Sequence, residues 1–212
     1  MNMAALKACS ALVSGANRGL GLEMVKQLLE ALFRSLGLYT AQDVNGLNLL
    51  VNNATVLPQK TMLTATVEDM QNTFNTNVIG ALFVIREYLP YLRTAAKASG
   101  KPGMSCDKAA VINISTDSAS MSFMPVLKEP FPFFPYSISK AGLNMLIIYT
   151  ARDLKVDEIL CISIHPGWVR RDMGGASIDA RESVEGMLGV IGSLTEKQNG
   201  GFLDYTGETI PW

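Results

Sequence analysis

The segment FPYSISKAG, residues 134–142, places Tyr136 and Lys140 four positions apart at the start of an apolar run. If this run is a helix, four residues make about one turn, so the two side chains share a face. A neighbouring ammonium group lowers the pKa of a phenol, because its positive charge favours the phenolate. The pair could therefore give a proton to a substrate, although the same spacing also fits an ordinary helix start.

A glycine-rich stretch, SGANRGLGLE at residues 14–23, contains Gly15, Gly19 and Gly21 between a short apolar run and a helical pattern. Strand, glycine loop and helix in this order are typical of a pyrophosphate site, since glycine permits close backbone approach and the helix start offers free N–H groups. A plain strand-to-helix turn is the alternative. Arg18 favours NADP over NAD, because a guanidinium can face the phosphate on the adenosine ribose; it could equally be a solvated loop charge.

The composition sets the limits for both hypotheses. A chain of 212 residues with 48% hydrophobic content predicts one domain, residues 1–212. The formal net charge of −1 leaves no basic excess for a nucleic-acid backbone, so we expect no nucleic-acid partner. The N-terminal apolar run is interrupted by Lys7, and no later stretch reaches 18 apolar residues, which predicts neither a signal peptide nor a membrane span.

The cysteines indicate the compartment. Cys9, Cys106 and Cys161 are odd in number, far apart and without metal-ligand spacing. We therefore expect no metal site and a reducing, cytoplasmic location.

Short apolar runs alternate with longer segments of helical periodicity, which is typical of strand–helix–strand units in a parallel sheet. The strand runs are continuous rather than alternating, as expected when helices cover both faces of the sheet. The predicted strands are Ala8–Val13, Leu47–Val51, Ala109–Ile114 and Leu160–Ile164. The predicted helices are Leu20–Leu36, Val67–Leu92 and Ser137–Leu154.

Six motifs in their order resemble the short-chain dehydrogenase/reductase family. They are Gly15-x-x-x-Gly19-x-Gly21, NNA at 52–54, NTNVIG at 75–80, VINIST at 111–116, YSISK at 136–140 and HPGWVRRDMGG at 165–175. The last motif and the tail GFLDYTGETIPW are similar to the C-factor or sniffer-type carbonyl reductases of that family. The resemblance covers nearly the whole chain except residues 34–46.

The resemblance implies an α/β fold with a Rossmann-like, doubly wound parallel sheet. It also implies that a small-molecule carbonyl substrate is reduced to an alcohol with hydride from NADPH. NAD is the other possible cofactor. It implies that Tyr136 donates the proton and that Lys140 lowers the Tyr136 pKa and holds the nicotinamide ribose. Thr116 would supply a hydroxyl to the substrate oxygen. Asn77 would bend its helix and hold a water that links Lys140 to solvent.

The implied cofactor-binding residues come from the same motifs. They are Gly15, Asn17, Arg18, Gly19, Leu20, Gly21, Asn53, Ala54, Tyr136, Lys140, Pro166, Gly167 and Val169. His165, just before Pro166, is expected to be a packed, hydrogen-bonded residue rather than a base.

Three residues depart from the family pattern. Thr116 stands where the family usually has serine, and its methyl group restricts the rotamer and crowds the carbonyl. Thr55 replaces a glycine that lies close to the cofactor, and Arg171 replaces a threonine.

The largest departure is a missing segment. Asn53 follows Gly15 by only 38 positions, which is too few for the family's first half, so two strands are expected to be absent. Residues 34–46 could hold at best one short strand, Leu38–Thr40, and Asp43 is expected in a turn. The first helix then either changes face, or forms a crossover of the hand avoided in about 98% of cases, or belongs to a chain that folds poorly.

Three functions stay open at this point: an NADP-dependent carbonyl reductase, a non-catalytic binding protein, and a shortened variant without a stable fold. The proline-rich, aromatic segment Phe123–Pro135 favours an apolar substrate, or simply covers the core. The apolar helix at 137–154 favours a homodimer.

Overall fold

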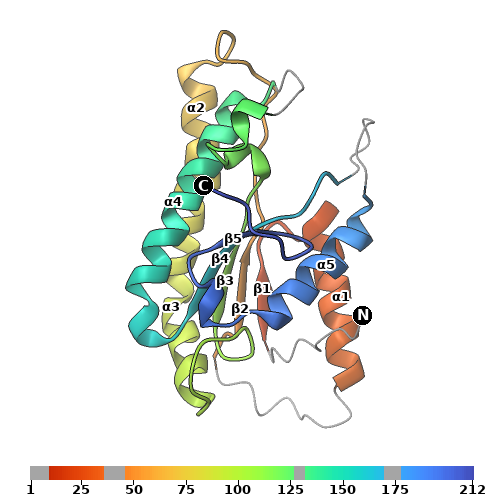
Figure 1. The fold of residues 1–212 in the computed structure, drawn as a ribbon, viewed down its shortest axis with the longest axis vertical. Coiled ribbons are helices and arrows are strands. Elements are labelled where there is room, and N and C mark those ends of the chain that lie inside the picture. Colours follow the sequence, from red (N-terminus) through yellow and green to blue (C-terminus); the bar gives the residue numbers. More distant parts are fainter. Residues whose placement is uncertain (1–9, 36–45, 127–131, 170–177) are drawn as a thin grey trace.

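The computed structural model describes residues 10–35, 46–126, 132–169 and 178–212. Its described strands form one parallel sheet with the order β1-β2-β3-β4-β5 (Figure 1). The strands are β1 (Ala11–Val13), β2 (Leu49–Asn52), β3 (Ala110–Ile114), β4 (Leu160–His165) and β5 (Phe202–Asp204). The predicted Rossmann-like class is confirmed, and five strands fit a truncated sheet.

The helices are α1 (Gly19–Ser35), α2 (Val67–Phe74), α3 (Ala81–Ala98), α4 (Phe134–Asp153) and α5 (Ala180–Ser193). The segment predicted as one helix, Val67–Leu92, contains a π-helical turn, Asn75–Gly80, between α2 and α3. A capping box between Thr66 and Asp69 begins α2, because each residue's side chain accepts a hydrogen bond from the other's backbone N–H. The expected Leu38–Thr40 strand and the Asp43 turn lie outside the described residues.

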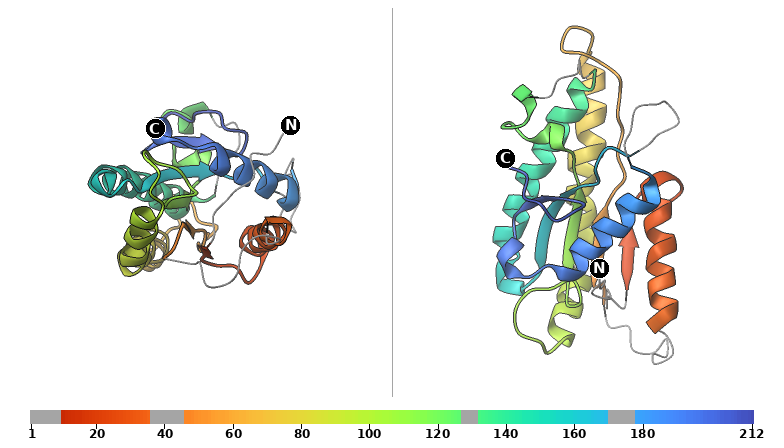
Figure 2. Two further views of the ribbon diagram at one scale, coloured as in Figure 1. Left: turned by 90° about the horizontal axis from the view of Figure 1, so that it is seen from below. Right: turned by 45° about the vertical axis from the view of Figure 1, so that its right-hand side comes forward.

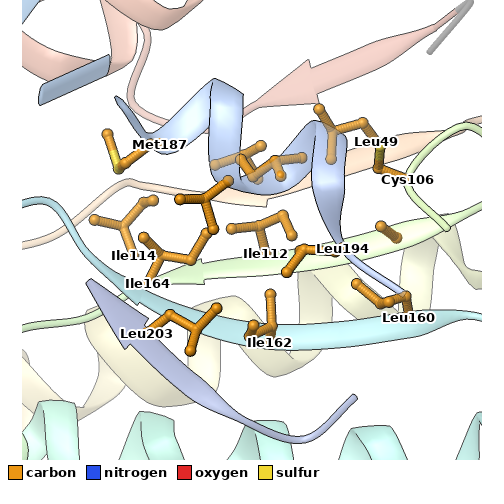
Figure 3. Packing of buried hydrophobic residues seen from close by; sticks show 14 of the residues in the cluster. Leu49, Cys106, Ile112, Ile114, Leu160, Ile162, Ile164, Met187, Leu194 and Leu203 are labelled. Carbon is orange, nitrogen blue, oxygen red and sulfur yellow. The ribbon is translucent and has the colours of Figure 1, made fainter. Parts of the chain in front are cut away.

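The two faces of the sheet bury different helices. On one face, Val51, Ile112 and Ile162 pack with residues of α1 and α5 (Figure 3). On the other face, Leu50 and Val111 pack with residues of α3 and α4. Every residue of β2, β3 and β4 is buried, as their continuous apolar sequences predict.

The placement of α1 answers the question about its crossover. The units β2–α3–β3 and β3–α4–β4 are right-handed, and their helices share one face (Figure 2). The helix α1 lies on the opposite face beside α5, so β1–α1–β2 is left-handed. The described sheet therefore accepts the disfavoured hand, and α1 does not change face.

Strand β1 ends the described sheet and pairs with β2 alone. A doubly wound sheet would continue past its first strand in the reverse direction. Ala11 is exposed, and Leu12 and Val13 are only half-buried. The described residues thus leave β1 as the edge strand that the missing segment predicts.

Among the described helices, none is both long enough and apolar enough to cross a membrane. The same residues contain no cluster of three or more His, Cys, Asp or Glu side chains suited to a metal ion. Cys106 and Cys161 are free and buried, and burial raises the pKa of each thiol to about 12.

Candidate active site

The first two turns of α4 bring Tyr136 and Lys140 together. Pro135 lies in the first turn, where its missing N–H costs no hydrogen bond. Tyr136 is 7% exposed and Lys140 is 1% exposed. The Lys140 Nζ atom lies 5.6 Å from the centre of the Tyr136 ring and donates a 2.6 Å hydrogen bond to the Ile114 carbonyl at the end of β3. The helical spacing therefore produces the expected contact of an ammonium with a phenol ring.

Asn77 lies in the π-helical turn and joins three segments. Its Oδ1 accepts hydrogen bonds from the Val56 N–H and the Thr55 hydroxyl, both at 2.9 Å. Its Nδ2 donates to the Val56 carbonyl at 3.0 Å and to the Ser139 hydroxyl at 2.9 Å. Both N–H groups of the amide are thus engaged by protein, so a water in this place would bind another group. A π-turn at a chemically important residue is common.

Thr116 lies two residues after the end of β3 and caps a short 3-10 helix, Asp117–Ala119. Its hydroxyl lies 3.1 Å from Asp117 Oδ1 and 3.3 Å from the Ser118 hydroxyl. Ser115 points elsewhere, because its hydroxyl donates to Asn144 Oδ1 at 2.7 Å. Both hydroxyls thus lie towards α4: Ser115 bonds Asn144 in the middle of the helix, whereas Thr116 lies next to Ser118, which contacts the start of the helix at Ser137.

Ser118 is a residue that sequence reasoning placed in a loop. It is 4% exposed, and its hydroxyl lies 3.1 Å from the hydroxyl of Ser137, the neighbour of Tyr136 in α4. A chain of hydroxyl groups therefore connects Thr116 to the start of α4. Its only sequence signal is the serine-rich stretch after β3.

The glycine loop packs tightly against the end of β2. Gly15 has a φ of +67°, and a Cβ added there would lie 2.8 Å from the Ala54 Cα. A Cβ on Gly21 would lie 2.5 Å from the Asn53 Nδ2 and the Gly15 carbonyl. Asn53 donates to the carbonyls of Ser14 and Gly15 at 3.0 and 3.3 Å. Glycine is therefore required at both positions by the neighbouring backbone, as well as by any bound phosphate.

Ser14 is the residue of this loop that sequence reasoning missed. Its hydroxyl accepts hydrogen bonds from the N–H groups of Asn53 at 3.0 Å and Ala54 at 3.1 Å. It therefore attaches the glycine loop to the end of the neighbouring strand. A hydroxyl residue directly before the first glycine was its only signal.

The outer part of the loop is open. Asn17, Arg18 and Gly19 are exposed at the start of α1, and a Cβ on Gly19 would meet nothing within 4 Å. Leu20 instead packs against the core below α1 and α5. Among the expected cofactor residues, Leu20 thus has a packing contact, whereas the three exposed residues border open space.

The segment after β4 carries Pro166, Gly167 and Val169 at the carboxyl end of the sheet. The Pro166 carbonyl accepts a 2.5 Å hydrogen bond from Ser183 of α5. Gly167 has a φ of +76°, and a Cβ there would lie 2.6 Å from the Ile178 Cδ1. Val169 forms an isolated parallel bridge with Ile178. Arg171 lies outside the described residues.

His165 is 8% exposed at the end of β4. Its Nε2 lies 3.7 Å from Asp117 Oδ2. Burial lowers the His165 pKa from the ordinary value of 6.5, and the charges of Asp117 and Asp204 oppose that effect. His165 is thus packed, as expected, but its Nδ1 has no hydrogen-bond partner among the described residues.

Comparison with known proteins decides the family. A family model described as short chain dehydrogenase matches residues 34–182. The C-signal protein of Myxococcus xanthus is 34% identical over 146 residues, which cover 68% of this chain and 79% of that protein. The chain belongs to the short-chain dehydrogenase family. The resemblance drawn from the six motifs is thereby confirmed.

Solved structures agree with this short-chain dehydrogenase fold. An NADPH-bound carbonyl reductase from chicken fatty liver has a TM-score of 0.84 and 32% identity, covering 98% of this chain and all of that one. The carbonyl reductase Sniffer of Drosophila melanogaster has a TM-score of 0.83 and 29% identity, covering 96% and 99% of the two chains. The family agrees with the expected NAD(P)-dependent oxidoreductase, and the chicken neighbour, which is NADPH-bound, agrees with NADP as its cofactor.

Proposed function

We propose that this short-chain dehydrogenase reduces a carbonyl compound to an alcohol with NADPH, and that Tyr136 donates the proton to the carbonyl oxygen. The proposal is supported by the family, by neighbours described as carbonyl reductases, and by the contact of Lys140 with the Tyr136 ring.

The place proposed for a dinucleotide is the crevice between the ends of β1 and β2. After β1 the chain passes to α1 on one face, and after β2 it passes to α2 and α3 on the other. Ligands of open α/β sheets bind where the connections that follow two neighbouring strands pass to opposite faces of the sheet. The left-handed β1–α1–β2 unit preserves this divergence, whereas a right-handed unit would send both connections to one face.

The glycine loop lies at this point of divergence. Its exposed outer part and the N–H groups that begin α1 suit a pyrophosphate, because a helix start carries partial positive charge. We propose that Gly15, Asn17, Arg18, Gly19, Leu20 and Gly21 hold the phosphate side, that Asn53 and Ala54 border the adenosine, and that Pro166, Gly167 and Val169 border the nicotinamide. Bound there, NADPH supplies the hydride.

The observation that most supports a catalytic role is the burial of Lys140. Taking an ammonium out of water is costly unless compensating contacts replace the lost hydration. A hydrogen bond to one carbonyl would hold the side chain in place, but a shorter polar residue could do that at lower cost. A buried positive charge over the Tyr136 ring favours phenolate formation and so eases proton transfer from Tyr136.

Thr116 is proposed to bind the substrate oxygen, with Ser118 next to it as a second hydroxyl. To donate to a substrate, the Thr116 hydroxyl must leave its present acceptor, Asp117 Oδ1. That competition favours weakened rather than abolished activity. The Thr55 departure is accommodated, because its hydroxyl donates to Asn77. Asn77 is proposed to act by fixing the position of α4 through Ser139.

A non-catalytic binding protein is the second candidate, and the engaged Thr116 hydroxyl favours it. The two functions differ in one experiment. NADPH oxidation would be followed by absorbance with a panel of aromatic aldehydes and ketones, alongside thermal unfolding with and without NADPH. Turnover supports the reductase. Stabilisation by NADPH without turnover supports the binding protein, and the absence of a cooperative transition supports a chain without a stable fold.

A homodimer belongs to the same proposal. The helix α4 exposes Ile138, Met145 and Tyr149 at 42%, 52% and 51%, and α3 exposes Phe83 at 55%. Apolar residues gathered on neighbouring helices often form a subunit contact. Sedimentation would show a dimer that Met145→Glu dissociates.

The free, buried cysteines Cys106 and Cys161 support the proposed reducing, cytoplasmic location.

A further inference from the structure

The sheet has a second point of divergence, between β3 and β4. After β3 the chain passes to α4 on one face, and after β4 it reaches α5 on the other. A cavity of about 320 Å³ lies here, and its lining comes from the segments that follow β3, β4 and β5. Its position meets the same topological condition as the proposed cofactor crevice, and apart from Gly167 its lining residues have no role in the proposed reaction.

The charged side chains that line the cavity among the described residues are acidic. Its lining contains Asp117, Asp204 and Glu208, and no lysine or arginine among the described residues. Asp117 Oδ2 accepts a 2.9 Å hydrogen bond from the Trp168 indole N–H, which fixes that carboxylate in the wall. Asp204 Oδ1 accepts from the N–H groups of Thr206 and Glu208 at 2.8 and 3.0 Å. The Asp117 and Asp204 carboxylates are therefore held by the fold, and none of the three acids forms an ion pair with a lysine or arginine of the described residues.

His165 lines the same cavity and gives an independent indication of a ligand. Its side chain is 10% exposed, and its Nδ1 has no hydrogen-bond partner among the described residues. Burial disfavours the imidazolium, so the ring is neutral near pH 7 and one of its nitrogens is an acceptor. With the proton on Nε2 facing Asp117, the buried Nδ1 lone pair has no donor among the described residues.

Aromatic and aliphatic side chains complete the wall. Phe123, Trp168 and Tyr205 line the cavity together with Ile178 and Ile210. Aromatic faces attract cations, and the gain is larger where water is excluded. Carboxylates, an N–H acceptor and aromatic faces together suit an ammonium group on an apolar body better than a neutral or anionic ligand.

We propose that this cavity binds a primary ammonium group attached to a small apolar body. The cavity borders the candidate active site, since Asp117 follows Thr116 and Gly167 belongs to both. Binding does not require hydride transfer or NADPH, so the site can be tested whether or not the chain proves to be a reductase.

The test uses three ligands of similar shape: phenethylamine, 2-phenylethanol and phenylacetate. Each would be titrated into the full chain at pH 7.5 by calorimetry, with no cofactor present. We expect phenethylamine to bind at least about tenfold more tightly than the alcohol, equivalent to about 1.4 kcal/mol, and phenylacetate to show no binding. Equal affinity for amine and alcohol, or preference for phenylacetate, would overturn the proposal.

Variants locate the binding. Glu208→Gln and Asp204→Asn each remove one charge, and Asn retains the Oδ1 acceptor of the Asp204 loop. We expect each to weaken phenethylamine binding about threefold to tenfold and to leave 2-phenylethanol unchanged. Asp153→Asn, an exposed acid on α4, is the matched control and should change neither affinity. Unchanged amine affinity in both cavity variants, with melting temperatures like the parent's, would place the amine elsewhere and refute the site.

Discussion

The two ends of the proposed cofactor site are built differently. At the catalytic end, Tyr136, Lys140 and Asn77 are buried and are tied to β3, to α4 and to the chain after β2. At the phosphate end, the loop Gly15–Gly21 follows an edge strand of three residues, and its outer part is exposed. The loop is held by Ser14 and Asn53 at the neighbouring strand.

This difference shows which half of the site depends on the strands that the sequence predicts to be missing. The catalytic end uses the chain after β2, the π-helical turn, β3 and α4, and both strands are covered on their two faces, so shortening the chain before β2 leaves these contacts in place. Among the described residues, the phosphate end has no strand beyond β1 that could end beside the adenosine ribose. Few buried contacts and an exposed edge also make this end the one that opens most readily.

The strongest way to break the catalytic end is Tyr136→Phe. We expect carbonyl reduction to fall about 10²-fold to 10⁴-fold, the usual contribution of a general acid, with NADPH affinity nearly unchanged. Initial rates and a calorimetric titration measure the two quantities. Tyr149→Phe, on the exposed part of the same helix, is the control and should retain full activity. Comparable turnover by Tyr136→Phe would refute the assignment of the proton donor.

The next effect concerns stability. Asn77→Ala removes the hydrogen bonds that the buried Asn77 amide makes to the exposed Val56 backbone and to the buried Ser139 hydroxyl, so we expect the free energy of unfolding to drop by about 1–3 kcal/mol. Urea unfolding measures it. The exposed Asn72 of α2 supplies the matched control, Asn72→Ala, which should cost less than about 0.7 kcal/mol. If the two variants lose equal stability, the catalytic end is not held by the Asn77 contacts.

A smaller change distinguishes the hydroxyl groups. Thr116→Ser should raise the rate, since it removes the crowding methyl group, and Thr116→Ala should lower it by about tenfold, the cost of one lost hydrogen bond. Single-turnover rates with NADPH would show both. If Ser115→Ala is the damaging change instead, Ser115 and not Thr116 supplies the hydroxyl to the substrate. If only Ser118→Ala lowers the rate, Ser118 supplies it.

The smallest effect is the pH dependence of stability from His165, which is the only histidine in the chain. Its pKa is lowered in the folded state, so the unfolded chain binds the proton more readily. Its contribution is therefore fully present above about pH 6.5 and is lost as the pH falls towards the folded-state pKa. As the pH is lowered from 8 to 5, the melting temperature of the parent should fall more steeply than that of His165→Asn. Identical profiles would contradict a buried, neutral His165.

Local sequence signals predicted the parts of the fold that are long and regular. The runs that became β3 and β4 are continuous and apolar, and α4 begins at Phe134, three residues before its predicted start at Ser137. The strand β5 was not predicted, because Phe202–Asp204 is too short to show a pattern. The helix α5 was not predicted either, since Gly186 and Gly189 weaken its helical signal.

The site was predicted unevenly for a related reason. Glycine spacing and the Tyr-Lys turn are local, so both could be found from the chain alone. The glycine at 186 becomes understandable only in the folded chain, where a Cβ would lie 2.6 Å from the Tyr205 carbonyl. The contact between Asp117 and Trp168 joins residues 51 positions apart, and Ser14 acts through a strand 39 positions later. Such pairings arise from the order of strands in the sheet, which periodicity does not encode.

The central claim is that the catalytic end is intact while the phosphate and adenosine end is weakened. Calorimetric titration with NADPH and with NADH tests it most directly, with the chicken fatty liver carbonyl reductase measured in parallel. We expect NADPH affinity about one to two decades below that of the comparison enzyme, matching a lost contact of about 1.5–3 kcal/mol, and less than about a tenfold preference between the two cofactors. Tight binding with a strong preference for one cofactor would contradict the account, because the adenosine site would then be complete despite the edge position of β1.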